Sequence, residues 1–429
     1  MKRKFNNLDL ELYEETLENG LRVYMIPKKN VSNIYVTFTT KYGSVDTTFE
    51  LDGKKITSPN GIAHFLEHKM FEAKNGIDPF TIFDQNGASS NAATSNYKTS
   101  YLFAGPTKLK ENLTTLLDFV QEPYFTDENV EKEKGIIIEE IKMCEDQPGR
   151  VGYNATLENA FVKHPIRIPV IGSEKSVKSI TKEDLYQCYK AFYHPKNMFL
   201  VITGNINPKE TLKIIKENQN KKTFEENYQK KVIFEKEPDK VAKKKTIQYQ
   251  NVTIPKVYYS YKINVENFDM NIRFITKYLS IYLDSLYGSV SDFAEEVEVK
   301  KIVNNGVDFI ISKTDSHLVI TFIAETKKTN ALIKIIKKYM GKEITIDDFN
   351  RKKKIMLSSN IYMSDNIFRL NNYVTDNILN YDEVMTDIYE ENKNLKYQNM
   401  ISLIQKINFK NTTTVIIKQK WVFTHFILL

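Results

Sequence analysis

The chain has 429 residues, of which 41% are hydrophobic, 12% aromatic and 27% charged, a composition typical of a globular protein with more than one core. Lysine and arginine outnumber aspartate and glutamate by 61 to 54, which gives a net charge of +7. No clustered basic face with interleaved aromatic residues accompanies this mild excess, so we expect no binding to nucleic acid.

The sequence also lacks the patterns of secreted and membrane proteins. No apolar run follows the basic residues of the N-terminal segment MKRKFNNLDLELYEE, and no stretch approaches the ~20 apolar residues of a membrane span. Two cysteines, Cys144 and Cys188, suit a reducing compartment without structural disulfides. We therefore expect a cytoplasmic protein that does not bind membranes. The apolar segment 421–429 is expected to pack against a domain or a partner, and His425 has no expected metal role.

A pair of strands is predicted near the start of the chain. Residues 21–26 form the first, and a turn at 27–30 leads to the second. In the second strand Ile34, Val36 and Phe38 alternate with tyrosine and threonine, as in a strand that is half buried.

Residues 61–76, GIAHFLEHKMFEAKNG, contain the motif H-x-x-E-H, formed by His64, Glu67 and His68. The spacing predicts a helix over about 60–74, because positions four apart lie on one face of a helix. Two imidazoles at this spacing reach one metal ion, with the Glu67 carboxylate between them. The residues expected to hold this helix in a core are Ile62, Phe65, Leu66 and Met70. A chance stack of two histidines on a surface helix is the alternative.

Residues 87–105, GASSNAATSNYKTSYLFAG, follow a second predicted helix at 79–85. They begin with small polar residues and then become rich in β-forming residues. Small side chains along an exposed strand allow a peptide backbone to pair with it, so residues 88–95 are a candidate substrate-binding strand. An ordinary Ser/Asn-rich hairpin explains the same pattern equally well.

A helix over about 127–144 offers the carboxylates that a metal site needs. A catalytic zinc usually has three protein ligands and an open position for water. Glu140 is the predicted third ligand, and Glu139 is the neighbour from which it must be distinguished. Glu133 lies two turns before Glu140 on the same face, where it suits a supporting role behind a ligand histidine or Glu67. A surface glutamate is the alternative for Glu133.

This set of residues predicts a hydrolytic chemistry that needs one zinc ion per chain. Zinc lowers the pKa of a bound water toward ~7 and polarises a peptide carbonyl. Glu67, which is not a ligand, would take the proton from that water and pass it to the leaving amine.

The second half of the chain repeats the first. Residues 317–340 follow the plan of residues 98–121, with a strand, a short turn and an amphipathic helix, and residues 408–419 echo the strand at 192–204. In this pairing Glu133 corresponds to Lys353 and Glu140 to Asn360, so the chemistry belongs to the first half. We expect a zinc-bearing domain over residues 1–220, a linker over 221–245 and a homologous domain without the metal motif over 246–429.

The chain resembles the pitrilysin/insulinase family of zinc metallopeptidases, the inverzincins, and within it the short bacterial members that are similar to processing peptidases. The resemblance covers nearly the whole chain and rests on the segments GIAHFLEHKMF, GASSNAATS, EKEKGIIIEEIKM, FYHPKNMFLVITGNI and GSVSDFAEE. It implies an α+β fold of two homologous α/β domains in tandem, each a mostly antiparallel sheet with helices packed on it. Two such chains, or four linked domains, enclose a chamber for peptides or unfolded segments.

By similarity, the zinc ligands are His64, His68 and Glu140, the general base is Glu67 and the supporting carboxylate is Glu133. Asn91 and Ala92 match the edge-strand positions that touch the substrate backbone.

One pair of residues departs from the family pattern. Active members use an arginine and a tyrosine seven residues apart, on a helix of the C-terminal domain, to hold the substrate carbonyl. Here Arg369 and Tyr373 are four residues apart, and Asp376 stands seven after Arg369. Either this chain forms the pair differently or another chain supplies it. We therefore predict a dimer, either of identical chains or with a sister subunit.

The sequence thus predicts a zinc endopeptidase that acts on short or unfolded peptides, in general peptide turnover or in the maturation of a ribosomally made peptide such as a bacteriocin precursor. The alternative is a non-catalytic scaffold subunit of a heterodimeric peptidase. The intact motif distinguishes the two, because a scaffold has no need of Glu67 or of the metal ligands.

Overall fold

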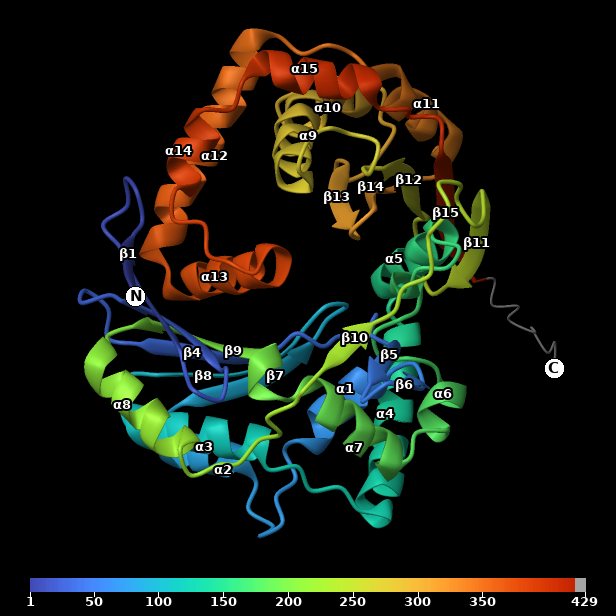
Figure 1. The fold of residues 1–429 in the computed structure, drawn as a ribbon. Helices are drawn as coiled ribbons and strands as arrows, with labels where there is room; N and C mark the ends of the chain where they lie inside the picture. The colour runs from blue at the N-terminus through green and yellow to red at the C-terminus, as the bar shows by residue number, and fades with distance from the viewer. Residues whose placement is uncertain (421–429) are drawn as a thin grey trace, which may run out of the picture. The chain divides into compact units, whose positions relative to one another are not determined.

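The structure, a computed structural model, describes residues 1–420 (Figure 1). The predictions for residues 421–429, including His425, lie outside the described residues. The chain forms two compact units, and each contains one large sheet. The first unit comprises residues 1–141, 169–234 and 356–394, and the second comprises 142–168, 235–355 and the described residues from 395 onward.

The sheet of the first unit has seven strands in the order β1-β2-β3-β9-β4-β8-β7. Their bounds are β1 (Lys2–Lys4), β2 (Glu11–Thr16), β3 (Arg22–Pro27), β4 (Ile34–Thr40), β7 (Ser89–Thr94), β8 (Thr99–Gly105) and β9 (Met198–Gly204). β3 and β9 run parallel, and the other neighbouring pairs run antiparallel. A smaller sheet in the same unit has the order β10-β5-β6, from β5 (Thr48–Leu51), β6 (Lys54–Thr57) and β10 (Lys230–Val232).

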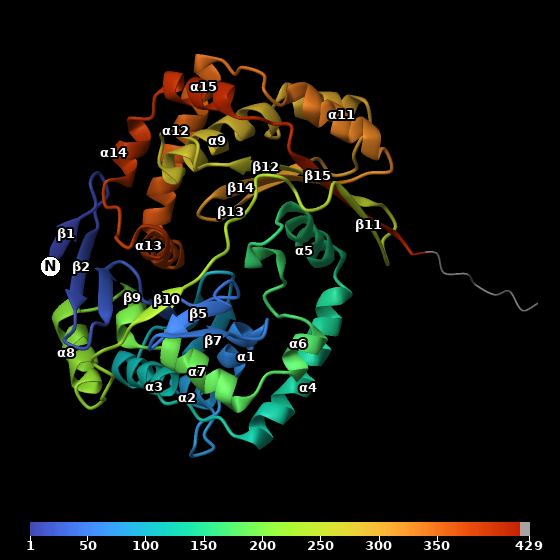
Figure 2. The same cartoon turned by 45° about the vertical axis from the view of Figure 1, so that its right-hand side comes forward.

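Helices cover both faces of the seven-stranded sheet. Figures 1 and 2 show α2, α3 and α8 on one face and α13 on the other. The helices of this unit are α1 (Ile62–Lys69), α2 (Pro79–Gln85), α3 (Leu109–Gln121), α6 (Glu174–Lys178), α7 (Lys182–Phe192), the short η2 (Pro195–Asn197), α8 (Pro208–Gln219), α13 (Ile367–Tyr381) and α14 (Ile388–Lys393). A further helix, α4 (Asp127–Glu145), begins in this unit and ends in the second.

Both predicted early strands are present, as β3 and β4, but the expectation that the second is half buried is wrong. β3 and β4 do not pair with each other, because β9 lies between them. β4 is buried along its whole length and not only on one face. The face predicted to be exposed is covered by α13: Thr37 Oγ1 donates to Asn371 Oδ1 at 2.8 Å, and the rings of Tyr35 and Phe368 lie 4.7 Å apart.

The sheet of the second unit repeats the topology of the first. Its order is β11-β15-β12-β14-β13, and only β11 and β15 are parallel. The bounds are β11 (Lys245–Gln250), β12 (Lys256–Asn264), β13 (Asp308–Lys313), β14 (His317–Glu325) and β15 (Thr412–Gln419). This order and these directions match β3-β9-β4-β8-β7 strand by strand, which confirms the predicted duplication and the α+β fold of two homologous domains.

Helices also cover this second sheet on both faces, with α5 on one face and α9 and α11 on the other (Figure 2), and α15 contacts α9. The bounds are α5 (Pro148–Ala160), η1 (Pro165–Arg167), α9 (Ile272–Tyr287), α10 (Asp292–Val299), α11 (Thr329–Tyr339) and α15 (Tyr397–Lys406); α12 (Ile346–Asp365) continues into the first unit. α5 packs closely on β12 at Gly152, where an added Cβ would lie only 2.1 Å from the ring of Tyr258.

Each unit therefore contains a helix from the other half of the chain. α5 comes from the N-terminal half and covers the second sheet, whereas α13 comes from the C-terminal half and covers the first. The compact units are consequently interleaved along the chain. The division into domains at 1–220 and 246–429 stays a prediction. The strands of the first large sheet all lie before residue 221, and those of the second all lie after residue 244. The expected linker, 221–245, is not purely a connector, since β10 pairs with β5.

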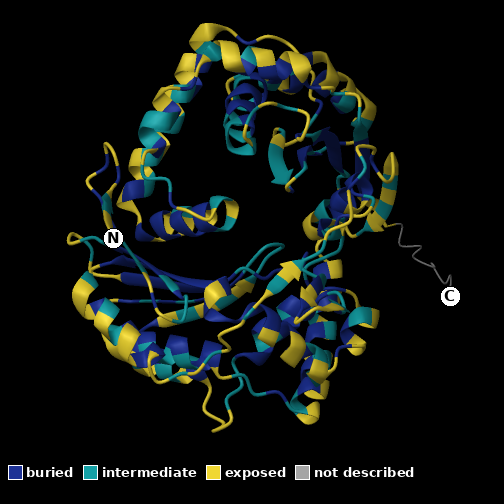
Figure 3. Ribbon diagram, in the orientation of Figure 1, coloured by how far each residue is buried: buried dark blue, intermediate teal, exposed yellow. Residues whose placement is uncertain are grey.

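The core lies where the strands meet these helices. In Figure 3 the central strands of the first sheet are dark blue, and the outward faces of the helices are yellow. The residues of α13 in this core, Leu370, Val374 and Ile378, pack with Ile26 and Val201 of β3 and β9. Among residues 1–420, no helix has the length and apolar character that a membrane crossing requires.

Candidate metal centre

α1 holds His64 and His68 at one turn's spacing. The helix starts after Gly61, whose φ of 89° lies in the left-handed region and whose place leaves no room for a Cβ, since one would lie 2.5 Å from the Ile171 carbonyl oxygen. As predicted, the apolar side of the helix is buried, through Ile62, Phe65, Leu66 and Met70. The helix ends at Lys69, earlier than the expected 74. The two imidazole rings lie 4.6 Å apart.

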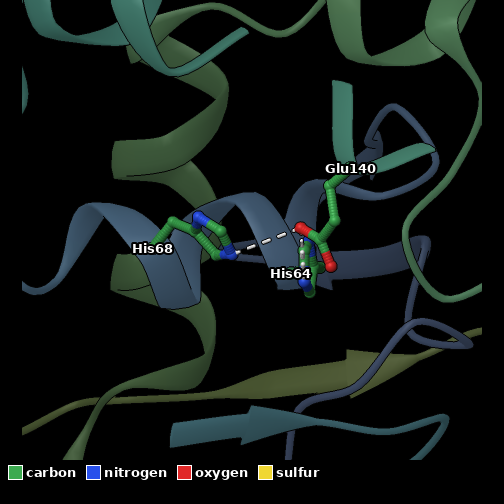
Figure 4. A group of neighbouring side chains, drawn as sticks. All are labelled: His64, His68 and Glu140. Atoms are coloured by element: carbon green, nitrogen blue, oxygen red, sulfur yellow. Dashed lines mark ion pairs between the residues drawn. The ribbon is translucent and has the colours of Figure 1, made fainter. Parts of the chain in front are cut away.

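Glu140, on α4, completes a cluster with the two histidines. Its Oε2 lies 3.7 Å from His64 Nε2 and 3.7 Å from His68 Nε2 (Figure 4). The three ligand atoms all lie within 4.8 Å of one another. Glu139, the neighbour left open by the sequence, is exposed and is not part of this cluster. The structure therefore brings together the three residues predicted to be ligands.

The cluster fits a zinc ion by its chemistry and its spacing. Two imidazole nitrogens and one carboxylate oxygen are a donor set that catalytic zinc sites use. Ligands at ~2.1 Å from a tetrahedral zinc lie roughly 3.4 Å from one another. The two separations from Glu140 Oε2 to the histidine nitrogens, 3.7 Å each, are close to this value.

Glu133 lies behind His68 and is buried, so it is not the surface glutamate of the alternative interpretation. Its Oε1 lies 3.0 Å from His68 Nδ1. Burial favours a raised pKa for the Glu133 carboxyl, but contact with His68 and Lys69 outweighs burial and holds the pKa below its usual value. Burial likewise favours a lower pKa for His68, but the Glu133 contact outweighs it and raises the pKa. These shifts favour the ionised Glu133 as an acceptor for the Nδ1 hydrogen.

Glu67 lies in the same helix as the histidines and is only 8% exposed. Burial raises the pKa of its carboxyl above the ordinary value, despite an opposing hydrogen bond from Thr94. That bond, Thr94 Oγ1 to Glu67 Oε2, measures 2.5 Å and joins β7 to α1. A carboxyl with a raised pKa is a better proton acceptor than an ordinary surface glutamate. Thr94 lies in the candidate strand, but no contact with Glu67 was predicted for it.

β7 is both an arm of a hairpin with β8 and an edge of the seven-stranded sheet, in the described part of the chain. Both interpretations of residues 87–105 are thus compatible with the structure. Asn91 is exposed and Ala92 is partly buried, and Asn91 Oδ1 accepts a hydrogen bond from Ala92 N at 2.8 Å. The alternate residues Ser90, Ala92 and Thr94 are partly buried.

Arg369 and Tyr373 both lie on α13 in the first unit, outside the metal-ligand cluster. Arg369 is exposed. Tyr373 packs against the core, and its hydroxyl donates to the Met385 carbonyl oxygen at 2.7 Å. Asp376, seven positions after Arg369, lies 3.6 Å from Lys98 Nζ. Substrate contact by Arg369 and Tyr373 stays a prediction.

Comparison with known proteins places this arrangement in a family. Residues 56–174 match the family described as "Insulinase (Peptidase family M16)", and residues 179–356 match "Peptidase M16 inactive domain". The chain belongs to the M16 insulinase family. The first match contains the whole metal cluster, and the M16 domain without metal ligands begins after it.

Related sequences and solved structures agree with this M16 assignment. The uncharacterized zinc protease YmfH of Bacillus subtilis is 41% identical over 310 residues, which are 71% of this chain and 72% of that protein. A putative M16-like peptidase from Alicyclobacillus acidocaldarius has 31% identity and a TM-score of 0.91, over 97% of this chain and 100% of the other. A probable mitochondrial-processing peptidase subunit beta of Arabidopsis thaliana is 29% identical over 208 residues, 47% of this chain and 37% of that protein.

Proposed function

We propose that this protein is a zinc-dependent endopeptidase that hydrolyses peptide bonds in short or unfolded peptides. The observation that carries the proposal is the convergence of His64, His68 and Glu140, with Glu67 buried beside them. A scaffold subunit would need the fold but not this cluster. The proposed role is either general peptide turnover or maturation of a precursor peptide such as a bacteriocin precursor. We also propose that the protein acts in the cytoplasm.

In the proposed hydrolysis, the three ligand residues and Glu67 have separate roles. His64, His68 and Glu140 would hold the zinc ion, which supplies a water of lowered pKa and polarisation of the scissile carbonyl. The Glu67 carboxylate takes a proton from the attacking water as the water oxygen bonds to the carbonyl carbon. The same group then returns the proton to the amine nitrogen as the carbon–nitrogen bond breaks, so no proton is lost or gained.

β7 provides the surface that would hold the substrate. Main-chain hydrogen bonds along a sheet edge bind an extended peptide without requiring a particular sequence. The side chains of β7 are small, and Asn91 stands exposed on it. The hydrogen bond between Thr94 and Glu67 connects this strand directly to the proposed base, so a peptide paired with β7 would lie next to the reacting groups.

Chelation followed by zinc restoration tests the proposed function. We expect the purified chain to contain about one zinc ion and to cleave a quenched-fluorescent peptide. A chelator should abolish cleavage, and stoichiometric zinc should restore it. The matched control is Glu139→Gln, which removes an exposed carboxylate next to Glu140 and should keep both zinc and cleavage. A chain that binds no zinc, or that cleaves equally well without it, would contradict the proposal.

We further propose that the working unit is a dimer, of identical chains or with a sister subunit. The unusual spacing of Arg369 and Tyr373 and the engagement of the Tyr373 hydroxyl support this proposal, because a partner would then supply the missing substrate contacts. Light scattering during size-exclusion chromatography, combined with the peptide assay, tests it. We expect cleavage to coincide with the dimer, and full cleavage by a monomer would exclude the idea.

A further inference from the structure

Lys69 is buried in a way that is rare for a lysine. It directly follows His68, forms the last residue of α1, and has an exposure of 0%. A lysine is almost never fully buried unless it is paired, because removal of the ammonium from water is costly. No role for this residue was predicted from the motif.

Three groups contact the Lys69 ammonium. Glu72 Oε1 lies 2.6 Å away, the Asn129 carbonyl oxygen accepts a hydrogen bond at 3.2 Å, and Glu133 Oε2 lies 3.7 Å away. Glu72 comes from the loop after α1, whereas Asn129 and Glu133 come from the first turns of α4. Lys69 therefore joins the helix of the two histidines to the helix of Glu140.

The Glu133 carboxylate is shared between Lys69 and His68. Oε2 faces the Lys69 ammonium, while Oε1 lies 3.0 Å from His68 Nδ1. A carboxylate with both oxygens engaged has one defined orientation. Donation of an Nδ1 hydrogen from His68 to Glu133 Oε1 would leave the ring lone pair on Nε2, the atom that faces Glu140.

We propose that Lys69 is a positioning residue for the metal centre: its ammonium fixes Glu133, and Glu133 fixes the ring and the tautomer of His68. The inference rests on the proposed function, since it assigns a role toward the same zinc site. It also predicts the direction in which zinc affinity changes when Lys69 is lost. A positive charge near a divalent cation repels it, so loss of Lys69 through charge alone would strengthen zinc binding, whereas loss of positioning would weaken it.

Zinc affinity, measured without any activity assay, tests the proposal. Competition with a chromophoric chelator at fixed pH and salt should show that Lys69→Met binds zinc about 10- to 100-fold more weakly than wild type, the usual effect of losing a group that orients a ligand. The visible spectrum of the cobalt-substituted protein should change as well. Lys69→Arg, which keeps the charge, should recover most of the affinity. A folded Lys69→Met with unchanged or tighter zinc binding would overturn the proposal.

A double-mutant cycle with Glu133 tests the route of the effect. Because Lys69 acts through Glu133, Lys69→Met should cost little further zinc affinity in a Glu133→Gln background. Two losses that simply multiply would show that Lys69 acts independently of Glu133 and would overturn the proposal. If Lys69→Met does not fold, Glu72→Gln replaces it as the test. This variant removes one partner of the Lys69 ammonium and should weaken zinc binding by a smaller factor. Unchanged zinc affinity in Glu72→Gln would then overturn the proposed role of Lys69.

A matched lysine elsewhere separates positioning from general destabilisation. Lys262, in the second unit, is 2% exposed and lies 2.5 Å from Glu237. Lys262→Met should lower the stability of the fold but leave the zinc affinity of the folded protein unchanged; an equal loss of zinc would overturn the proposal. Wild type without zinc would refute the proposed function itself, whereas zinc-binding wild type with an unaffected Lys69→Met refutes only the role of Lys69.

Discussion

Glu67→Gln should retain about one zinc ion per chain and lose peptide cleavage by about 10²- to 10⁴-fold, the usual contribution of a general base. The amide has the size of the carboxylate and can still accept a hydrogen bond from Thr94, so the fold and the metal ligands should be unaffected. It cannot take a proton from water. Metal analysis beside a quenched-fluorescent peptide assay on the same preparation measures both quantities.

The retained zinc is the internal control for this variant, because it shows that lost cleavage does not come from a lost metal. Glu139→Gln provides the second control, as a glutamate-to-glutamine change outside the cluster. A fully active Glu67→Gln would refute the assignment of the general base, and loss of zinc from this variant would instead make Glu67 a ligand.

His68→Ala should lose the zinc ion and, with it, all measurable cleavage. One of three protein ligands disappears, and Glu133 loses the ring to which it is hydrogen bonded. Removal of a ligand should weaken zinc binding beyond the ~10- to 100-fold that follows from losing a supporting group. Chelator competition and metal analysis check this outcome.

His194→Ala is the matched control for this variant. His194 is also a largely buried histidine of the first unit, but it contacts the Glu225 carbonyl oxygen and lies outside the metal cluster. It should keep zinc at the wild-type affinity. If His68→Ala kept its zinc as firmly as His194→Ala, the ligand assignment would be wrong.

The parts of the site that depend on local spacing could be predicted from the sequence. The interval between His64 and His68 places both rings on one face of a helix wherever that helix packs. The seven-residue interval between Glu133 and Glu140 likewise gave two carboxylates on one face of α4. Helix spacing alone did not settle the choice of Glu140 over Glu139, because that choice depends on how α4 turns toward α1; the structure agrees with Glu140.

Contacts between distant segments were beyond the sequence. The alternation around Val36 and Phe38 correctly predicted a strand, but it could not reveal that residues more than 300 positions later cover the other face. Lys69 was missed for the same reason: its partners Asn129 and Glu133 are some 60 positions away. A lysine within the apolar run FLEHKMF was the available signal, since a charge there requires a buried partner.

The covering of the first sheet by α13 has a consequence for the order of events during synthesis. Asn371 donates hydrogen bonds to Tyr35 O and Val201 O and accepts one from Thr37. These bonds can form only after α13, which lies late in the chain, has been synthesised. A nascent polypeptide still on the ribosome can make the histidine helix early, but the sheet of the same unit is covered only after α13, which ends at Tyr381, has emerged. Biosynthesis itself thus delays completion of the unit that contains the candidate metal centre until the α13 segment has been made.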